Sequence, residues 1–163
     1  MGTSGTAKVT FPADEQVLIT REFEAPRHLV YRAWTTPDLV KRWWAGQQGT
    51  MTSVEIDLRV GGQWRYVMNT NGGEAIAFHG EFQEIVPDER LVNTEVFELG
   101  PSEGEQPALV TTEFADAGEG RTALTLLSVM PNKESRDAMI DAGMEHGMQQ
   151  QMDLLEGLAA SLA

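Results

Sequence analysis

The spacing of apolar residues changes once along this chain of 163 residues, and that change restricts the fold more than any other feature. Six segments in the middle of the chain alternate apolar and polar side chains, which is typical of strands with one buried face. Near the C-terminal end, apolar residues recur at steps of three and four, which indicates one long amphipathic helix over residues 134–161. A sheet with one apolar face must be covered, and this helix is the only long amphipathic element available. The six predicted strands are Val54–Asp57, Gln63–Asn69, Ala75–Val86, Leu91–Phe97, Ala108–Ala115 and Thr122–Met130.

The segment before these strands predicts one further strand and two short helices. Val17–Glu24 is rich in β-branched and apolar residues and indicates a strand. Apolar residues at helical spacing follow in Arg27–Trp34, and a second short helix is expected over Pro37–Trp43, with proline at its first position. Residues 1–13 show no periodicity and are expected to form a disordered N-terminus. A chain of this length has room for one core, so residues 14–163 are expected to form a single α+β domain.

Charge and composition exclude several classes of partner. The formal net charge of −13 works against binding to phosphates, so we expect no nucleic-acid partner. The acidic residues, Glu95 among them, lack the spacing of a calcium loop and are interpreted as a solvating surface. The chain has no cysteine, which excludes disulfides and cysteine-ligated metals. No apolar run approaches the ~20 residues that span a bilayer, and no apolar segment follows Met1, so we expect a cytoplasmic protein without stable membrane insertion.

Candidate catalytic and metal-binding residues are few. His79 and Glu81 lie two positions apart on a predicted strand, so they share a face and could act as a general base and its orienting group. The alternative is a pair that faces solvent. His28 and His146 have no second histidine at ligand spacing, and no glycine-rich phosphate loop or nucleophile elbow is present. We therefore predict no catalytic residue, no metal and no cofactor.

Ordered motifs along the chain resemble a known family, the relatives of the activator of the heat-shock protein 90 ATPase, within the START-like and Bet v 1-like helix-grip superfamily. The resemblance covers about Val17–Leu162. It implies a curved antiparallel sheet of about seven strands around a long C-terminal helix, with two short helices after the first strand and a cavity between sheet and helix. The chain departs once, because Met148 stands where family members often have tryptophan. The motifs are Trp34–Leu39, Arg42–Trp44, Asp57–Trp64, His79–Phe82, Glu84-Ile85 and Pro87–Leu91.

Strand parity selects the side chains that could line such a cavity. Trp64, Tyr66 and Met68 share one face of their strand, and on the next strand the same parity turns Phe78 and Phe82 inward and His79 outward. Methionines on the C-terminal helix would form an adaptable opposite wall. The alternative is an ordinary filled core, which is what most apolar stripes form. The expected ligand-binding residues are Trp43, Trp64, Tyr66, Met68, Phe78, Phe82, Val96, Phe114, Met130, Met144, Met148, Met152 and Leu155.

The resemblance and the apolar pattern together favour binding of a small hydrophobic ligand, such as a lipid, a fatty acid or an aromatic, polyketide-like compound. Two alternatives follow from the resemblance: an enzyme of the aromatase or cyclase kind, and a chaperone-associated or regulatory interaction module. An enzyme would place a carboxyl or tyrosine hydroxyl group with a perturbed pKa inside the cavity, whereas a binding protein would have an almost wholly apolar lining. An interaction module would have a filled core and an exposed apolar patch.

Overall fold

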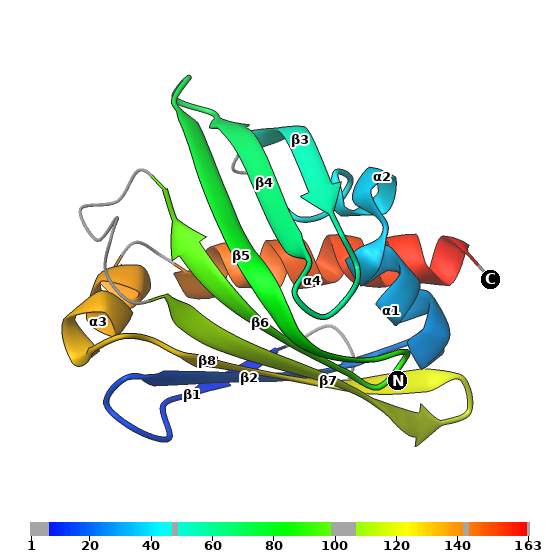
Figure 1. The fold of residues 1–163 in the computed structure, drawn as a ribbon. Coiled ribbons are helices and arrows are strands. Elements are labelled where there is room, and N and C mark those ends of the chain that lie inside the picture. Colours follow the sequence, from blue (N-terminus) through cyan, green and yellow to red (C-terminus); the bar gives the residue numbers. More distant parts are fainter. Residues whose placement is uncertain (1–6, 47–48, 99–106, 142–143, 163) are drawn as a thin grey trace.

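An antiparallel sheet of eight strands organises the protein, and α4 (Met144–Ser161) runs across one face of it (Figure 1). The computed structural model describes residues 7–46, 49–98, 107–141 and 144–162. The strand order is β1-β2-β8-β7-β6-β5-β4-β3. Strand β2 therefore pairs with β8, and the strands from β8 to β3 lie side by side in reverse chain order. This confirms the predicted α+β, helix-grip-like fold, with eight strands in place of about seven. The strands are β1 (Lys8–Thr10), β2 (Gln16–Phe23), β3 (Gly49–Ile56), β4 (Gln63–Thr70), β5 (Ala75–Val86), β6 (Arg90–Phe97), β7 (Ala108–Gly118) and β8 (Arg121–Val129).

The additional strand, β1, lies within the segment that was expected to be disordered. It pairs antiparallel with β2, with Lys8 opposite Thr20. The side chain of Gln149 on α4 then fixes the start of β1, because its Nε2 donates to the Ala7 carbonyl at 2.9 Å and its Oε1 accepts from the Ala7 amide at 3.1 Å. The prediction of disorder is wrong for this part because these partners are distant in sequence. Residues 1–6 lie outside the described residues.

The helices differ from the prediction in one respect, since the C-terminal segment contains two helices. The two short helices after β2 are present as α1 (Arg27–Thr35) and α2 (Pro37–Val40). The last strand is followed by α3 (Lys133–Asp141), and the Asn132 side chain caps α3 by accepting from the Ser135 amide at 2.8 Å. Ala142 and Gly143 stand between α3 and α4 and lie outside the described residues. The prediction of one helix is wrong because α3 packs against β2 and α4, and the local spacing of apolar residues does not reveal these contacts.

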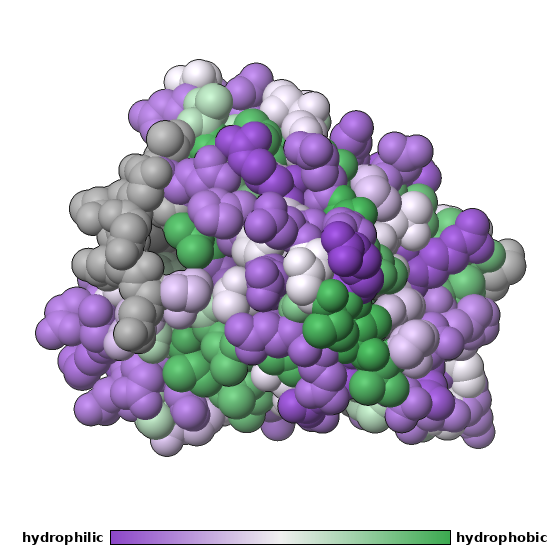
Figure 2. All heavy atoms as spheres, in the orientation of Figure 1, coloured by the Kyte–Doolittle hydropathy of each residue, from purple (hydrophilic) through white to green (hydrophobic). Residues whose placement is uncertain are grey.

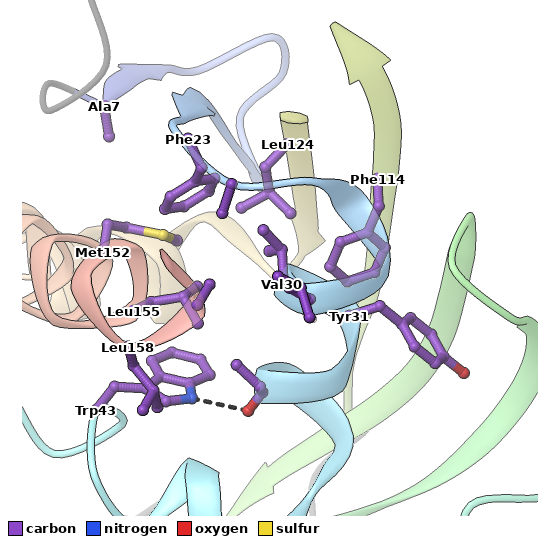
Figure 3. Close-up of a cluster of buried hydrophobic side chains, with 14 of the residues drawn as sticks. Ala7, Phe23, Val30, Tyr31, Trp43, Phe114, Leu124, Met152, Leu155 and Leu158 are labelled. Atoms are coloured by element: carbon purple, nitrogen blue, oxygen red, sulfur yellow. Dashed lines mark hydrogen bonds between the residues drawn. The ribbon is translucent and has the colours of Figure 1, made fainter. Parts of the chain in front are cut away.

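A densely packed core fills the space between α1, the second half of α4 and the strands β2, β7 and β8 (Figure 3). Phe23, Val30, Phe114 and Leu155 are each at most 1% exposed. Burial of each such side chain contributes roughly 2 kcal/mol of transfer free energy. This cluster holds α1 and the second half of α4 on the sheet at one end. The first half of α4 faces a different part of the sheet.

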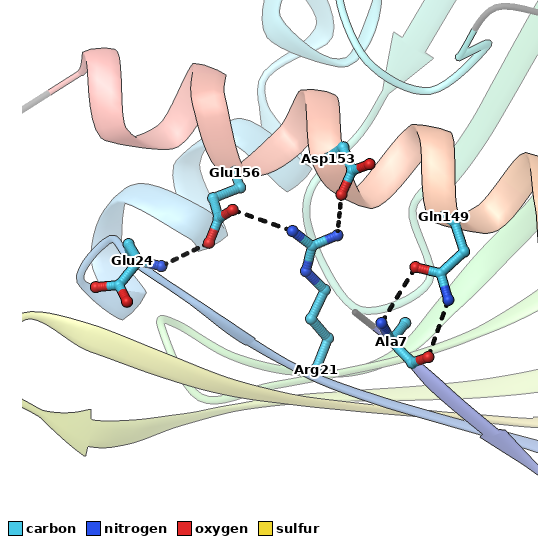
Figure 4. A network of polar contacts seen from close by, with 6 residues as sticks. All are labelled: Ala7, Arg21, Glu24, Gln149, Asp153 and Glu156. Atoms are coloured by element: carbon cyan, nitrogen blue, oxygen red, sulfur yellow. Dashed lines mark hydrogen bonds and ion pairs between the residues drawn. The ribbon is translucent and has the colours of Figure 1, made fainter. Parts of the chain in front are cut away.

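One buried cation fixes α4 against β2 (Figure 4). The side chain of Arg21 is 0% exposed, and its Nη1 lies 2.8 Å from Asp153 Oδ1 while its Nη2 lies 3.1 Å from Glu156 Oε1. Glu156 also accepts a hydrogen bond from the Glu24 amide at 2.9 Å. The Arg21 guanidinium stacks over the ring of Phe23, 5.0 Å from its centroid. These contacts set the distance between helix and sheet, and with it the space between them.

Candidate functional site: a hydrophobic cavity

A cavity of about 840 Å³ lies between the sheet, α3 and α4. Its walls come from all strands except β1, from the C-terminal end of α1, from the segment that follows α2, and from one face each of α3 and α4. This volume falls in the range of about 300–1,000 Å³ that is typical of small-molecule sites. The core cluster near α1 is filled, while the part of the sheet beyond it borders this partly open cavity.

Aromatic rings form a continuous wall of the cavity. Trp44 meets Phe78 edge-on with centroids 4.9 Å apart, and it meets Tyr66 in the same way at 5.2 Å. Tyr66 in turn lies 4.7 Å from Trp64. These four residues belong to β4, β5 and the segment after α2, so the wall depends on how that segment packs on the sheet. Such rings offer both apolar area and π faces to a ligand.

Trp43 and Trp44 take different roles. Trp43 is 3% exposed, and its indole Nε1 donates to the Ala33 carbonyl at 3.0 Å (Figure 3). Its ring packs against Trp34 with centroids 5.0 Å apart, and both rings contribute to the lining. Trp44 is half-buried, and its carbonyl accepts a hydrogen bond from Gln151 on α4. The two indoles therefore join the segment after α2 to the rest of the cavity wall.

Glycine 80 allows the aromatic wall to pack against the sheet. The Trp64 side chain crosses β5 at this position, and its Nε1 donates to the Thr94 carbonyl on β6 at 3.2 Å. A Cβ atom on Gly80 would lie 2.6 Å from that nitrogen and 1.8 Å from the Thr94 oxygen. Only glycine fits such a close approach.

Methionines line both the sheet side and the α4 side of the cavity. Met148 and Met152 project from α4, and Met68 and Met130 come from β4 and the end of β8. Met148 and Met152 are buried although they border the cavity, because the core packs against their other side. Unbranched, polarizable side chains of this kind adapt to differently shaped ligands.

Two of the predicted site residues lie in the filled core. Phe114 is in edge contact with Tyr31 and Trp34 below α1, and Leu155 lies one turn beyond Met152 in the same cluster. Both face inward, but at the end of the sheet that α1 closes. The side chain of Met144 lies outside the described residues. The remaining ten predicted residues lie in the cavity wall: Trp43, Trp64, Tyr66, Met68, Phe78, Phe82, Val96, Met130, Met148 and Met152.

The sequence interpretation missed a carboxyl group in the cavity. Leu91, Asn93 and Glu95 alternate on β6 and line the cavity, so Glu95 does not belong to the solvating surface. Within the described residues, no hydrogen bond or ion pair involves its carboxylate. Burial raises the pKa of Glu95 to about 7, and burial together with the charge of Glu95 raises the pKa of Tyr66. The alternation along β6 was the signal that could have identified this side chain.

The ionisable groups of the lining are all acidic or phenolic. Glu95 lies on β6 and Glu134 on α3, and Tyr66 adds its hydroxyl group. No lysine, arginine or histidine belongs to the lining within the part of the chain that the structure describes. The neutral polar side chains include Asn93, Thr112 and Ser128. The cavity is thus apolar and aromatic, with a negative electrostatic bias.

The His79–Glu81 pair considered from the sequence does not form, because His79 has a different partner. Its Nδ1 lies 2.8 Å from Glu98 Oε2 on the outer side of the sheet, and its side chain is 46% exposed. Arg65 binds the same carboxylate through two hydrogen bonds of 2.9 Å. The Arg65 guanidinium, with His79, lowers the pKa of Glu98 to about 2. His79 therefore belongs to the outer surface. Figure 2 shows one face of the molecule, on which hydrophilic residues predominate and hydrophobic residues form smaller patches.

Over residues 7–46, 49–98, 107–141 and 144–162, no group of three or more acidic or histidine side chains is placed to hold a metal ion. In the same ranges no helix has the length and apolar character needed to cross a membrane.

Known proteins resemble the chain in sequence family and in fold. The model of the family described as Activator of Hsp90 ATPase homolog 1-like protein matches residues 24–160. A crystal structure from Rhodobacter sphaeroides superposes with a TM-score of 0.85 at 23% identity, over 96% of this chain and 99% of that one. A protein from Nitrosomonas europaea gives 0.81 at 23% identity over 93% and 98%, and one from Arthrobacter aurescens gives 0.82 at 23% over 94% and 91%. No curated protein matches the chain. At these identities the structural matches establish the fold alone.

Proposed function

Because this chain belongs to the Activator of Hsp90 ATPase homolog 1-like protein family and encloses a cavity of about 840 Å³, we propose that it binds a small hydrophobic molecule between the sheet and α4. The candidates are a lipid chain or an aromatic, polyketide-like compound. The observation that carries the proposal is the lining itself, in which aromatic rings on β4 and β5 face methionines on α4 across open space.

Burial of apolar surface would supply most of the binding free energy. Each methylene group that a ligand transfers from water into an apolar site contributes about 0.8 kcal/mol. A cavity with few polar groups demands little desolvation from such a ligand, and its methionine side can adjust to the ligand's shape. These features support binding of apolar molecules in preference to polar metabolites.

The test uses N-phenyl-1-naphthylamine, an apolar dye that is uncharged at neutral pH and fluoresces when it leaves water. Ser128 lines the cavity, so Ser128→Phe places a ring inside it. Thr125 lies three residues earlier on β8, on the opposite face, and Thr125→Phe adds the same ring outside. We expect the dye to bind the unchanged protein and Thr125→Phe alike, and Ser128→Phe to bind it at least about tenfold more weakly. Equal binding by both folded variants, or no binding by the unchanged protein, would contradict the proposal.

A second candidate function is an enzyme that transfers protons to or from a ligand in the cavity. Glu95 favours it, because a carboxyl group with a pKa of about 7 can both give and take a proton near neutral pH. Asn93 and the Tyr66 hydroxyl lie on the same wall and could orient a substrate carbonyl. Under this candidate, Glu95→Gln would abolish turnover of a polyketide-like substrate while binding persisted. Turnover that is unchanged in Glu95→Gln would exclude it.

A further inference from the structure

The charge of the cavity lining narrows the chemical class of the ligand beyond what the apolar character of the lining indicates. The lining carries the carboxyl groups of Glu95 and Glu134, and in the described residues it holds no basic side chain. A carboxylate or phosphate ligand would enter a site without a counter-charge, close to a carboxyl group of the same sign. The whole molecule, at a formal charge of −13, adds repulsion at long range.

Aromatic faces and a carboxyl group meet on one part of the wall. The ring centroid of Trp44 lies 5.2 Å from that of Tyr66 and 4.9 Å from that of Phe78. Phe78 pairs with Phe97 in the sheet, two residues along β6 from Glu95, and the charge of Glu95 acts on the Tyr66 hydroxyl. The carboxyl group and these rings therefore border the same region of the cavity.

This combination is the one that recognises an organic cation. A ring presents a negative π face, and an ammonium group placed over it gains attraction that grows as water is removed. A carboxylate without another partner adds an ion pair and a charge-assisted hydrogen bond. Neither element is needed to bind a neutral hydrocarbon, and a carboxyl group without a partner is costly in an apolar site.

We propose that the ligand has an apolar body and a positively charged amine, with the ammonium group held by Glu95 beside the Trp44, Tyr66 and Phe78 rings. This inference rests on the proposed function, since it assigns a chemical class to the ligand of the same cavity. The apolar body contacts the methionine side, including Met148 and Met152 on α4. Fatty acids are then the least suitable of the apolar ligands.

The experiment compares three compounds that share one biphenyl body: 4-phenylbenzylamine, biphenyl-4-methanol and biphenyl-4-carboxylic acid. Each competes with N-phenyl-1-naphthylamine at neutral pH for the unchanged protein, for Glu95→Gln and for Glu81→Gln. The Glu81 side chain is exposed on β5, so its variant removes the same formal charge outside the cavity.

We expect the amine to bind the unchanged protein about tenfold more tightly than the alcohol, and the carboxylic acid to bind most weakly. Glu95→Gln should reduce the amine to the affinity of the alcohol and leave the alcohol unchanged, whereas Glu81→Gln should keep the preference. An amine that binds no better than the alcohol, or a preference that survives in Glu95→Gln, overturns this inference while the proposed function stands. Failure of the dye and of all three compounds to bind overturns both.

Discussion

The indole nitrogen of Trp64 donates a hydrogen bond to the carbonyl oxygen of Thr94 at 3.2 Å, across the strand that separates them. This bond satisfies the one polar atom of a side chain that is only 4% exposed. It also fixes the position of the Trp64 ring, which contributes to the cavity wall. The relationship depends on Gly80, which leaves room for the indole on β5.

Replacement of Gly80 by alanine should therefore destabilise the fold. The added methyl group would lie 1.8 Å from backbone oxygen of Thr94, which cannot move without disturbing the ladder between β5 and β6. We expect Gly80→Ala to lower the free energy of unfolding by about 3 kcal/mol, measured by urea denaturation. Gly157 on α4 is the control, since a Cβ there meets nothing within 4 Å. Gly157→Ala should stabilise by about 0.5–1 kcal/mol, and a neutral Gly80→Ala would contradict the packing described.

Loss of the buried arginine should weaken the attachment of α4. Arg21→Ala removes the partner of Asp153 and Glu156 and leaves a void beside Phe23, so we expect a loss of about 3 kcal/mol of unfolding free energy. Arg21→Met should recover most of that loss by filling the space. Arg59, whose side chain is 71% exposed beside Asp57, provides the surface comparison, and Arg59→Ala should cost less than about 1 kcal/mol. Equal losses for Arg21→Ala and Arg59→Ala in urea denaturation would show that the buried pair does not anchor α4.

Glu95 should make the empty protein less stable as pH rises. Its pKa is about 7 in the folded protein against an ordinary value of 4.5, so the folded state holds the proton that the unfolded state has already released. Stability is then lost as pH rises from about 4.5 to about 7, by up to about 3 kcal/mol. Glu95→Gln removes this cost. We expect it to match the unchanged protein at pH 4 and to exceed it at pH 8 in urea denaturation, and an identical difference at both values would contradict the burial of this carboxyl group.

Glu98 should have the opposite effect at acid pH. Its pKa is lowered to about 2 by Arg65 and His79, so its contribution is present above about pH 4.5 and is lost as pH falls through about 2. The group lies near the surface, where solvent screening reduces the value of such a pair to about 1 kcal/mol. At pH 7 the Glu98→Gln variant should unfold at a lower temperature than the unchanged protein, and the two unfolding temperatures should converge towards pH 2. A gap that stays constant over this range would argue against the ion pair.

Much of the sheet could be predicted because its signals are local. β5 has the predicted bounds Ala75–Val86, since alternating residues and the turns on each side are enough to define a hairpin strand. β1 could not be predicted, because a strand of three residues depends on pairing with β2 and on the Gln149 side chain, both far away in sequence. The presence of two helices, α3 and α4, was missed because the apolar residues keep helical spacing from Ile140 to Met148.

The sequence predicts which side chains face inward, but not which of them border the cavity. Alternation places Trp64 and Phe82 on the inner face of the sheet, and it does the same for Phe114. Whether an inward residue borders space or solid core depends on α1, which covers the sheet near Phe114 and not near Trp64. Glu95 obeys the same alternation, but its acidic side chain suggested the surface. Its place in the lining depends on segments that are distant in sequence, such as β4 and α3.

Methyl NMR of methionine-labelled protein, titrated with N-phenyl-1-naphthylamine, tests most directly whether the space between sheet and α4 holds a ligand. Met68, Met148 and Met152 line the cavity from β4 and α4. We expect the aromatic rings of the dye to shift the three lining methyl signals together, with one saturation curve that matches the fluorescence. Lining signals that do not move while the fluorescence saturates would contradict a ligand-binding cavity.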